Sequence, residues 1–287
     1  PYKLVAMATR TPQDAQRAVD FPMGILGRSF YVFSITGIGV RVHALLPVYT
    51  LVSAFSTLHY GSLLTTFHAI LLNGPVLWLS VLFHELCHCW AARYVGTQVQ
   101  DILLWPLGGL AFIGRSPSAC ADMQIAVAGP SSHVPQIVLL LALVAVSNGG
   151  SMGPDQGFES YASLLFYSAA MLNLAMMLFN LCLPCYPLDG GRILADALLI
   201  RQMSASDAAR VVIFVSLPII TALGAYGLYG IVAGRASAML TCFIALWMLW
   251  QTHQLWKVRQ AGLAHTHPLF ANASTPPPTD ADYHYTG

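Results

Sequence analysis

Charged side chains are scarce in this sequence of 287 residues: they make up 9% of it, whereas hydrophobic residues make up 56%. Soluble domains carry about 25% charged residues. Together with a mean hydropathy of +0.62, this scarcity argues against a soluble domain and indicates a membrane protein that crosses the bilayer several times. The formal net charge of +1 is too small to indicate binding to nucleic acid.

Cysteine is also sparse, and its placement is informative. The six cysteines do not form the layout of a secreted disulfide scaffold, because four of them lie in apolar segments. Free cysteines on apolar helices are most often small hydrophobic residues. We therefore expect the close pairs Cys87 and Cys89, and Cys182 and Cys185, to pack against neighbours rather than to bind metal.

Long apolar runs are the main feature that the sequence does contain. Because about 20 apolar residues span a bilayer as a helix, these runs predict about six transmembrane helices, at 44–60, 64–95, 124–146, 161–183, 208–233 and 236–256. Of the thirteen lysines and arginines, twelve fall on one side of the resulting topology and one on the other. The positive-inside rule therefore predicts that both chain termini face the cytosolic or an equivalent side.

Two segments outside these runs favour β-structure. Residues 30–42 are rich in β-branched and aromatic residues, and residues 98–114 contain two short apolar stretches around a Pro-Leu-Gly-Gly turn. We predict an all-α polytopic membrane protein with a small membrane-associated β-hairpin or sheet. Its expected parts are a polar N-terminal arm (1–29), a membrane core (30–201), two C-terminal transmembrane helices (202–256) and a disordered polar tail (257–287).

One of the only two glutamates, Glu85, lies in the apolar stretch VLFHELCHCW. His84 and His88 are spaced i and i+4, so on a helix both imidazoles project from one face and suit two ligands of a tetrahedral zinc. Glu85 points about 100° away from His84 and can act as a base toward water at the metal. The alternative is a structural histidine pair in a bundle core. Ionisable residues at membrane depth are functional by default, which favours a catalytic zinc site.

Two histidines leave the third zinc ligand open. Within the apparent membrane depth, the only other acid is Asp189, in FNLCLPCYPLDGGR. Pro184 and Pro187 break the helix there, and an unwound segment at membrane depth is tolerated only where it is buried in protein or lines a wet cavity. The alternative is that Asp189 caps the following helix. We favour the ligand.

These residues resemble a known family. HELCH in one apolar run and NLCLPCYPLDGG in a later one are similar to the paired motifs of the site-2 protease family, peptidase M50, of intramembrane zinc metalloproteases. GIGVRVHALLPV, LLWPLGGLAFIG and AGP resemble the family's entry strand, membrane-associated hairpin and third-span motif. The resemblance covers about residues 30–200 and implies that the membrane core (30–201) is the catalytic part of the chain. No stretch is long enough for a PDZ or paired CBS domains, so the compact form is expected.

The resemblance implies a set of roles for these residues. One zinc ion per chain is held by His84, His88 and Asp189, and Glu85 is the general base. The reaction is hydrolysis of a peptide bond in or near a transmembrane segment of a single-span or other membrane-protein substrate, known as regulated intramembrane proteolysis. Asn180 corresponds to the family's asparagine, which positions the substrate or stabilises the oxyanion.

The sequence departs from the family pattern at two places. Asn180 lies nine residues before Asp189, one more than the pattern has, and Asn173 is a rival two turns earlier on the same face. After the AGP motif, His133 stands near the place of the usual asparagine. We expect His133 to be a polar contact between helices rather than a group that touches the site.

Other functions predict other patterns. A metal-transporting or metal-binding membrane protein needs repeated acidic or histidine sites along a path, and this chain offers one cluster. An inactive family member that acts as a scaffold does not need Glu85. The hairpin at 98–114 is either a turn between spans or an edge strand that captures an unwound substrate by strand addition, and the sequence leaves both open.

Overall fold

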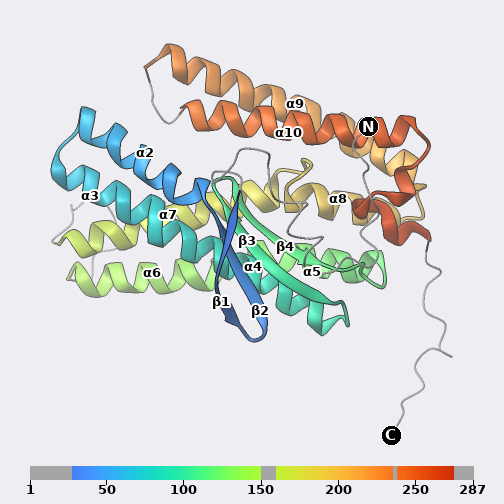
Figure 1. The fold of residues 1–287 in the computed structure, drawn as a ribbon, viewed down its shortest axis with the longest axis horizontal. Helices are drawn as coiled ribbons and strands as arrows, with labels where there is room; N and C mark the ends of the chain where they lie inside the picture. Colours follow the sequence, from blue (N-terminus) through green and yellow to red (C-terminus); the bar gives the residue numbers. More distant parts are fainter. Residues whose placement is uncertain (1–27, 150–159, 235–237, 275–287) are drawn as a thin grey trace, which may run out of the picture.

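The computed structural model describes residues 28–149, 160–234 and 238–274. Most of them are helical, and four strands form a single small sheet (Figure 1). The longer helices are α2 (Leu45–Tyr60), α3 (Leu63–Leu71), α4 (Leu77–Tyr94), α5 (Ala119–Ser131), α6 (His133–Ser147), α7 (Tyr161–Cys182), α8 (Asp189–Ile200), α9 (Ala205–Val232) and α10 (Ala238–Gln260). Short elements are the π-helical turn η2 (Leu72–Val76) and the 3₁₀ helices η4 (Ala264–Thr266) and η5 (Pro268–Ser274).

Four helical stretches are long and apolar enough to cross a membrane: Leu63–Tyr94, Ala119–Ser147, Tyr161–Cys182 and Ala205–Val232. Helix α2 is apolar but shorter, with 16 residues. Helix α10 has 23 residues, but its second half contains the polar run Gln251–Gln254. Helices therefore occupy all six predicted ranges. The predicted class, a polytopic helical membrane protein with a small sheet, is confirmed, with six as an approximate count.

Two of the predicted spans are each divided into two helices. Between α3 and α4 the backbone of Gly74 is non-helical (φ −101°, ψ −109°), and Pro75 supplies no N–H to the helix ladder. The Ala119–Ser147 stretch is divided at Ser132, which ends α5 two residues after Pro130 and begins α6. The halves α4 and α5 carry most of the site described below.

The sheet joins the two predicted β-segments. Strands β1 (Ser29–Ile35) and β2 (Ile38–His43) form an antiparallel hairpin, so residues 30–42 contain a strand, a turn and a second strand. Strand β3 (Val99–Trp105) pairs with β2 in parallel and with β4 (Gly108–Ile113) in an antiparallel hairpin, as predicted. The order β1-β2-β3-β4 makes β4 an edge strand.

The inner face of the sheet packs on α4. Ile38, Val40 and Ile102 are almost fully buried and form one apolar cluster with Leu82 and Leu86 of α4. Burial of such a side chain contributes about 1.5–3 kcal/mol. The sheet is therefore fixed to the helix that carries the histidine pair, with its edge strand β4 in contact with that helix.

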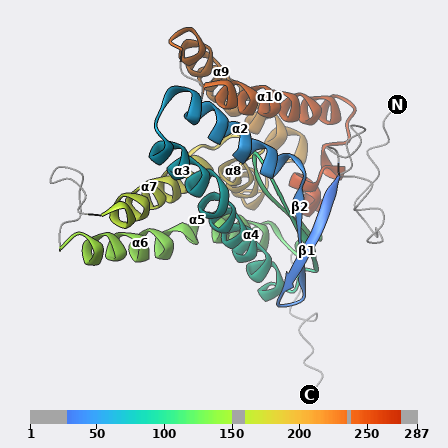
Figure 2. The same cartoon turned by 60° about the vertical axis from the view of Figure 1, so that its left-hand side comes forward.

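Helices α9 and α10 lie side by side along one edge of the molecule, and α6 and α7 pair on another side (Figures 1 and 2). The prediction of a disordered tail from residue 257 is wrong for residues 257–274. Helix α10 continues to Gln260, and Leu269 and Phe270 of η5 are buried against α8, α9 and α10. These two apolar side chains give the segment a packing surface that its polar average composition hides. The predicted arm and the remainder of the tail, 1–27 and 275–287, lie outside the described residues.

Candidate metal centre

Three predicted ligand side chains meet where α4 faces the start of α8. Nε2 of His84 lies 3.1 Å from Oδ2 of Asp189, and Nε2 of His88 lies 3.3 Å from Oδ1 of the same carboxylate. The two Nε2 atoms are 3.0 Å apart. Both histidines are buried. Among the described residues, these three form the one group of His, Cys, Asp or Glu side chains whose ligand atoms converge in this way.

This donor set fits zinc. Imidazole nitrogen and carboxylate oxygen are ordinary zinc ligands, and atoms held about 2.0–2.2 Å from a tetrahedral ion lie about 3.3–3.6 Å apart. The observed separations of 3.0, 3.1 and 3.3 Å need only a small expansion. Acceptor atoms this close repel one another unless a cation lies between them. These three side chains could therefore hold a metal ion as a three-ligand set.

The first residues of α8 place Asp189. The N-cap of the helix is Leu188, whose backbone is extended, and no side chain caps the helix. The alternative role of Asp189 as a cap is therefore wrong, since it is the first helical residue and its carboxylate faces the histidines. The helix start is pressed onto the preceding loop, because a Cβ at Gly190 would lie 2.9 Å from the carbonyl carbon of Leu183. A Cβ at Gly191 would likewise lie 2.5 Å from that of Cys185.

The glycine of the AGP motif has a physical role in this structure. Gly129 of α5 lies against the ligand face of α4, where a Cβ would overlap Nε2 of His88 and lie 2.7 Å from Nε2 of His84. Any larger residue at this position displaces one of the imidazoles. The motif that the sequence offers only as a resemblance is thus explained by the close approach of α5 to the histidine pair.

A backbone carbonyl orients His88. Nδ1 of His88 lies 2.6 Å from the carbonyl oxygen of Ile125 in α5. Because a carbonyl oxygen only accepts hydrogen bonds, Nδ1 carries the proton, and the lone pair of Nε2 faces Asp189. A histidine that ligates a metal is commonly held in this way by a partner at its other nitrogen.

A chain of hydrogen bonds orients His84. Its Nδ1 lies 3.0 Å from Nε2 of His133 in α6, and Nδ1 of His133 lies 2.8 Å from Oδ1 of Asn173 in α7. The amide nitrogen of Asn173 is already a donor to Ser80 Oγ (3.1 Å) and to the carbonyl of Ala169 (2.9 Å). Oδ1 therefore accepts from His133, His133 Nε2 accepts from His84, and the lone pair of His84 Nε2 is left for the site.

Two expectations from the sequence change here. His133 does form a polar contact between helices, but the prediction that it does not touch the site is wrong, since it is the direct partner of His84. Asn173, the rival of Asn180, is the asparagine in this network. The structure does not bring Asn180 into it, because its side-chain amide donates to the Met176 carbonyl of its own helix (3.0 Å). No local pattern signals the contact of Asn173 with His133, since the two residues are 40 positions apart.

Glu85 is buried next to the ligands but is not one of the three converging residues. Its carboxylate lies against the edge strand β4, where a Cβ at Gly109 would be 2.6 Å from the carboxylate carbon. A glycine at this position lets the strand approach Glu85 closely. The acid is thus held between the ligand helix and the exposed edge of the sheet.

Sequence reasoning missed two further buried acids besides Glu85 and Asp189. Asp122 of α5 and Asp196 of α8 are both buried. Asp122 accepts two hydrogen bonds from Arg192 of α8, at 2.9 and 2.6 Å. An arginine three residues after Asp189 was the available signal, because a charged residue beside a buried segment calls for a buried partner.

Comparisons with known proteins agree with this centre. A family model described as peptidase family M50 matches residues 75–223, about half of the chain, and the matched region contains all three converging ligands. The chain belongs to this family. The predicted resemblance to site-2 proteases is confirmed, and the described residues contain no PDZ or CBS domain.

Two of three similar proteins are named as zinc metalloproteases, and the third is named as a sporulation protein. The chain is 34% identical over 167 residues to "Zinc metalloprotease MJ0392" of Methanocaldococcus jannaschii, covering 58% of this chain and 44% of the relative. It is 33% identical over 181 residues to "Putative zinc metalloprotease Rip3" of Mycobacterium tuberculosis, covering 60% of this chain and 44% of the relative. It is 30% identical over 173 residues to "Stage IV sporulation protein FB" of Bacillus subtilis, covering 58% and 54%. The matches thus span about half of these relatives.

A solved structure shares the fold. The site-2 protease from Methanocaldococcus jannaschii superposes with a TM-score of 0.57 at 24% sequence identity, over 79% of this chain and 94% of that chain. At this identity the likeness concerns the fold alone.

Proposed function

We propose that this chain is a zinc metalloprotease that hydrolyses peptide bonds in or near the transmembrane segments of membrane proteins. The observation that carries the proposal is the convergence of His84, His88 and Asp189 beside the buried Glu85 in a chain with several membrane-capable helices. The three side chains would hold one zinc ion per chain. Bound there, zinc supplies Lewis acidity, which polarises a carbonyl group and makes water nucleophilic near neutral pH.

Glu85 acts as the general base and then as the general acid. It takes a proton from the attacking water and delivers it to the nitrogen of the leaving amine, so its carboxylate returns to its starting charge. Its burial between α4 and β4 supports this role, because the carboxylate has a fixed position and limited contact with bulk water. The hydrogen-bond chain from Asn173 through His133 keeps His84 in the tautomer that ligation needs.

The edge strand β4 is the proposed substrate platform. Within the described residues β4 pairs with no strand other than β3, so its other edge is where an extended peptide would add as a further strand. That edge strand lies against Glu85 at Gly109. A substrate strand added there would bring an unwound peptide bond close to the base, which solves the problem that a helix hides its peptide bonds. The contact with Glu85 favours this function over a simple turn.

Asn180 keeps its proposed role at the substrate or the oxyanion. Its hydrogen bond to Met176 uses one of the two amide hydrogens and leaves the other as a donor. We also propose that the centre opens toward the positively charged side of the membrane. The support is that twelve of the thirteen lysines and arginines fall on that side of the topology.

Among the described residues no second converging group of ligands exists along a path, which leaves the metal-transport alternative without support. The inactive-scaffold alternative is decided by the same experiment as the proposal. That experiment is Glu85→Gln, measured for zinc content by elemental analysis and for cleavage of a model single-span substrate in detergent or liposomes. We expect about one zinc per chain to remain and cleavage to fall by about 10²–10⁴-fold, the usual contribution of general acid–base catalysis.

A matched control is Asp101→Asn, which removes a carboxylate in β3 that is paired with Arg41 (3.1 Å) on the sheet. It should leave both zinc content and cleavage close to the wild type. Cleavage by Glu85→Gln at the wild-type rate would overturn the proposed mechanism. A wild-type chain that binds zinc but cleaves no substrate would instead support the scaffold.

A further inference from the structure

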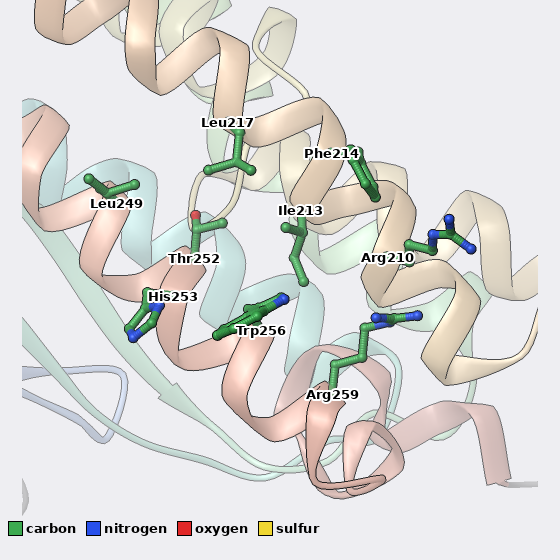
Figure 3. Close-up of a pocket in the computed structure, with 9 residues that line it drawn as sticks. All are labelled: Arg210, Ile213, Phe214, Leu217, Leu249, Thr252, His253, Trp256 and Arg259. Carbon is green, nitrogen blue, oxygen red and sulfur yellow. The ribbon is translucent and has the colours of Figure 1, made fainter.

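A groove with a volume of about 630 Å³ lies between α9 and α10, away from the metal centre (Figure 3). Its apolar lining comes from Ile213, Phe214 and Leu217 of α9 and from Leu249 and Trp256 of α10. Several of these side chains are exposed, and Phe214 reaches 64%. Helix α9, which forms one wall of the groove, is long and apolar enough to cross a membrane, so we expect this wall to meet lipid.

Two arginines stand together at one end of the groove, and Leu217 and Leu249 lie toward the other end (Figure 3). The arginines come from opposite ends of an antiparallel helix pair: Arg210 lies near the start of α9 and Arg259 near the end of α10. The groove therefore has a cationic mouth and a mostly apolar body, in which Thr252 and His253 of α10 are the polar side chains.

Neither arginine has an acidic partner in the part of the chain that the structure describes, where the arginine ion pairs are Arg41–Asp101 and Arg192–Asp122. Both are nevertheless held in place. Nε of Arg259 donates to the carbonyl oxygen of Ser206 (2.9 Å), which leaves its two terminal nitrogens free to donate elsewhere. The guanidinium carbon of Arg210 lies 5.7 Å from the ring centre of Phe214.

The dimensions of the groove match one leaflet of a bilayer. Arg259 and Leu249 are ten residues apart on α10, which is about 15 Å along a helix. The hydrocarbon core of a bilayer is about 30 Å thick, so the groove covers about half of it. Trp256 lies between the two, close to the cationic end, where tryptophan is enriched at membrane interfaces.

We propose that this groove binds an anionic phospholipid, with its phosphate between Arg210 and Arg259 and an acyl chain along Phe214, Leu217 and Leu249. Two preorganised guanidinium groups match the geometry and charge of a phosphate. Both arginines belong to the positively charged side of the topology, so the lipid comes from that leaflet. A transmembrane helix of another protein fits less well, because it would leave both arginines at the groove mouth without an anion. The proposal does not depend on proteolysis.

The test uses the purified full chain in nanodiscs and brominated phospholipids, which quench tryptophan fluorescence on contact. The probes are dibrominated phosphatidylglycerol and dibrominated phosphatidylcholine, each diluted in unlabelled phosphatidylcholine. The chain has six tryptophans, so the signal of Trp256 is obtained by subtracting the spectrum of Trp256→Phe. We expect phosphatidylglycerol to quench Trp256 at a severalfold lower mole fraction than phosphatidylcholine. Equal quenching by the two lipids would overturn the proposal.

Charge variants locate the headgroup. Combining Arg210→Gln with Arg259→Gln should abolish the severalfold preference for phosphatidylglycerol, because each basic residue at an anionic surface contributes part of the attraction. The pair Arg210→Lys and Arg259→Lys keeps both charges and should retain most of the preference, which guards against a loss caused by misfolding. The matched control Lys257→Gln removes a positive charge from the same end of α10 without lining the groove.

The control should leave the preference unchanged. If Lys257→Gln lowers it as much as either arginine variant does, the attraction belongs to the membrane surface in general and the proposal is wrong. Leu249→Phe fills the apolar end and should weaken quenching by both lipids. Displacement of both lipids to the same extent by an added transmembrane peptide would assign the groove to a helix and overturn the proposal.

Discussion

Helix α8 contributes to two buried clusters whose key residues are three positions apart, and the clusters do different things. At its first residue, Asp189 faces His84 and His88. At Arg192, the same helix meets the buried Asp122 of α5. Both clusters join the start of α8 to a helix that precedes it by many residues, and both contain a carboxylate that is withdrawn from water.

The two clusters differ in the groups that balance the negative charge of each carboxylate. Arg192 gives Asp122 two hydrogen bonds and a full positive charge, so that cluster is complete within the chain. Asp189 meets two imidazoles whose facing nitrogens carry lone pairs, an arrangement whose negative charge the proposed zinc ion would balance. Burial of an acid therefore does not identify a metal site. The identity of the atoms around the acid does.

The largest effect should separate the two carboxylates. Asp189→Asn removes a proposed ligand charge, and we expect zinc content to fall to background and cleavage to be lost. Asp122→Asn should retain about one zinc per chain. It should lower the free energy of unfolding by at most about 3 kcal/mol, since the Arg192 side chain is 27% exposed and regains some water. Elemental analysis and thermal unfolding in detergent measure the two quantities. If both variants lost zinc to the same extent, the two carboxylates would not differ in their contribution to zinc binding.

A second prediction tests how closely α5 must approach the histidines. Gly129→Ala places a methyl group on Nε2 of His88, so zinc affinity should fall more than 100-fold, beyond the 10–100-fold typical of changes to groups behind the ligands. The matched control is Gly224→Ala in α9, where the added Cβ would meet Ala245 at an ordinary contact of 3.7 Å.

Competition with a fluorescent zinc chelator gives both affinities. Unchanged affinity in Gly129→Ala would mean that α5 lies farther from the ligands than the structure shows.

The smallest effect distinguishes two asparagines on α7. Asn173→Ala removes the acceptor that orients His133 and, through it, His84. Zinc affinity should fall by about 10–100-fold, and Asn173→Asp, which keeps an acceptor oxygen, should recover most of it. Asn180→Ala breaks only a bond to its own helix and should leave zinc affinity unchanged while lowering the rate of cleavage. Loss of zinc affinity in Asn180→Ala but not in Asn173→Ala would instead show that Asn180 orients His133.

Local spacing was enough to predict the part of the site on one helix. His84 and His88 share a face of α4 because i and i+4 residues do so on any helix. The contact of Asp189 with the two histidines was also predictable. Few acids occur in the apolar segments, and this one lies where prolines interrupt a helix, so it was the main candidate for a polar partner. The comparison of this chain with a known family added the pairing of the two motifs.

The remaining contacts depend on tertiary structure. The partner of His84 was not predictable, since His133 and Asn173 lie on separate helices whose rotation the sequence does not specify. The burial of Asp122 depends on an arginine 70 positions later. Phe270 was assigned to a disordered tail because the average composition of residues 257–287 conceals a short apolar segment that α8 and α9 cover.

The separation of the ligands along the chain sets the order in which this protein can be assembled. Asp189 follows His84 by 105 positions, so α4, strands β3 and β4 and helices α5, α6 and α7 are all synthesised between the two residues. Until α8 docks, the two histidines offer only a weak site for a metal ion. Under the proposed function, a chain that has not yet reached Asp189 therefore lacks one of the three side chains that would hold the zinc and has no proteolytic activity.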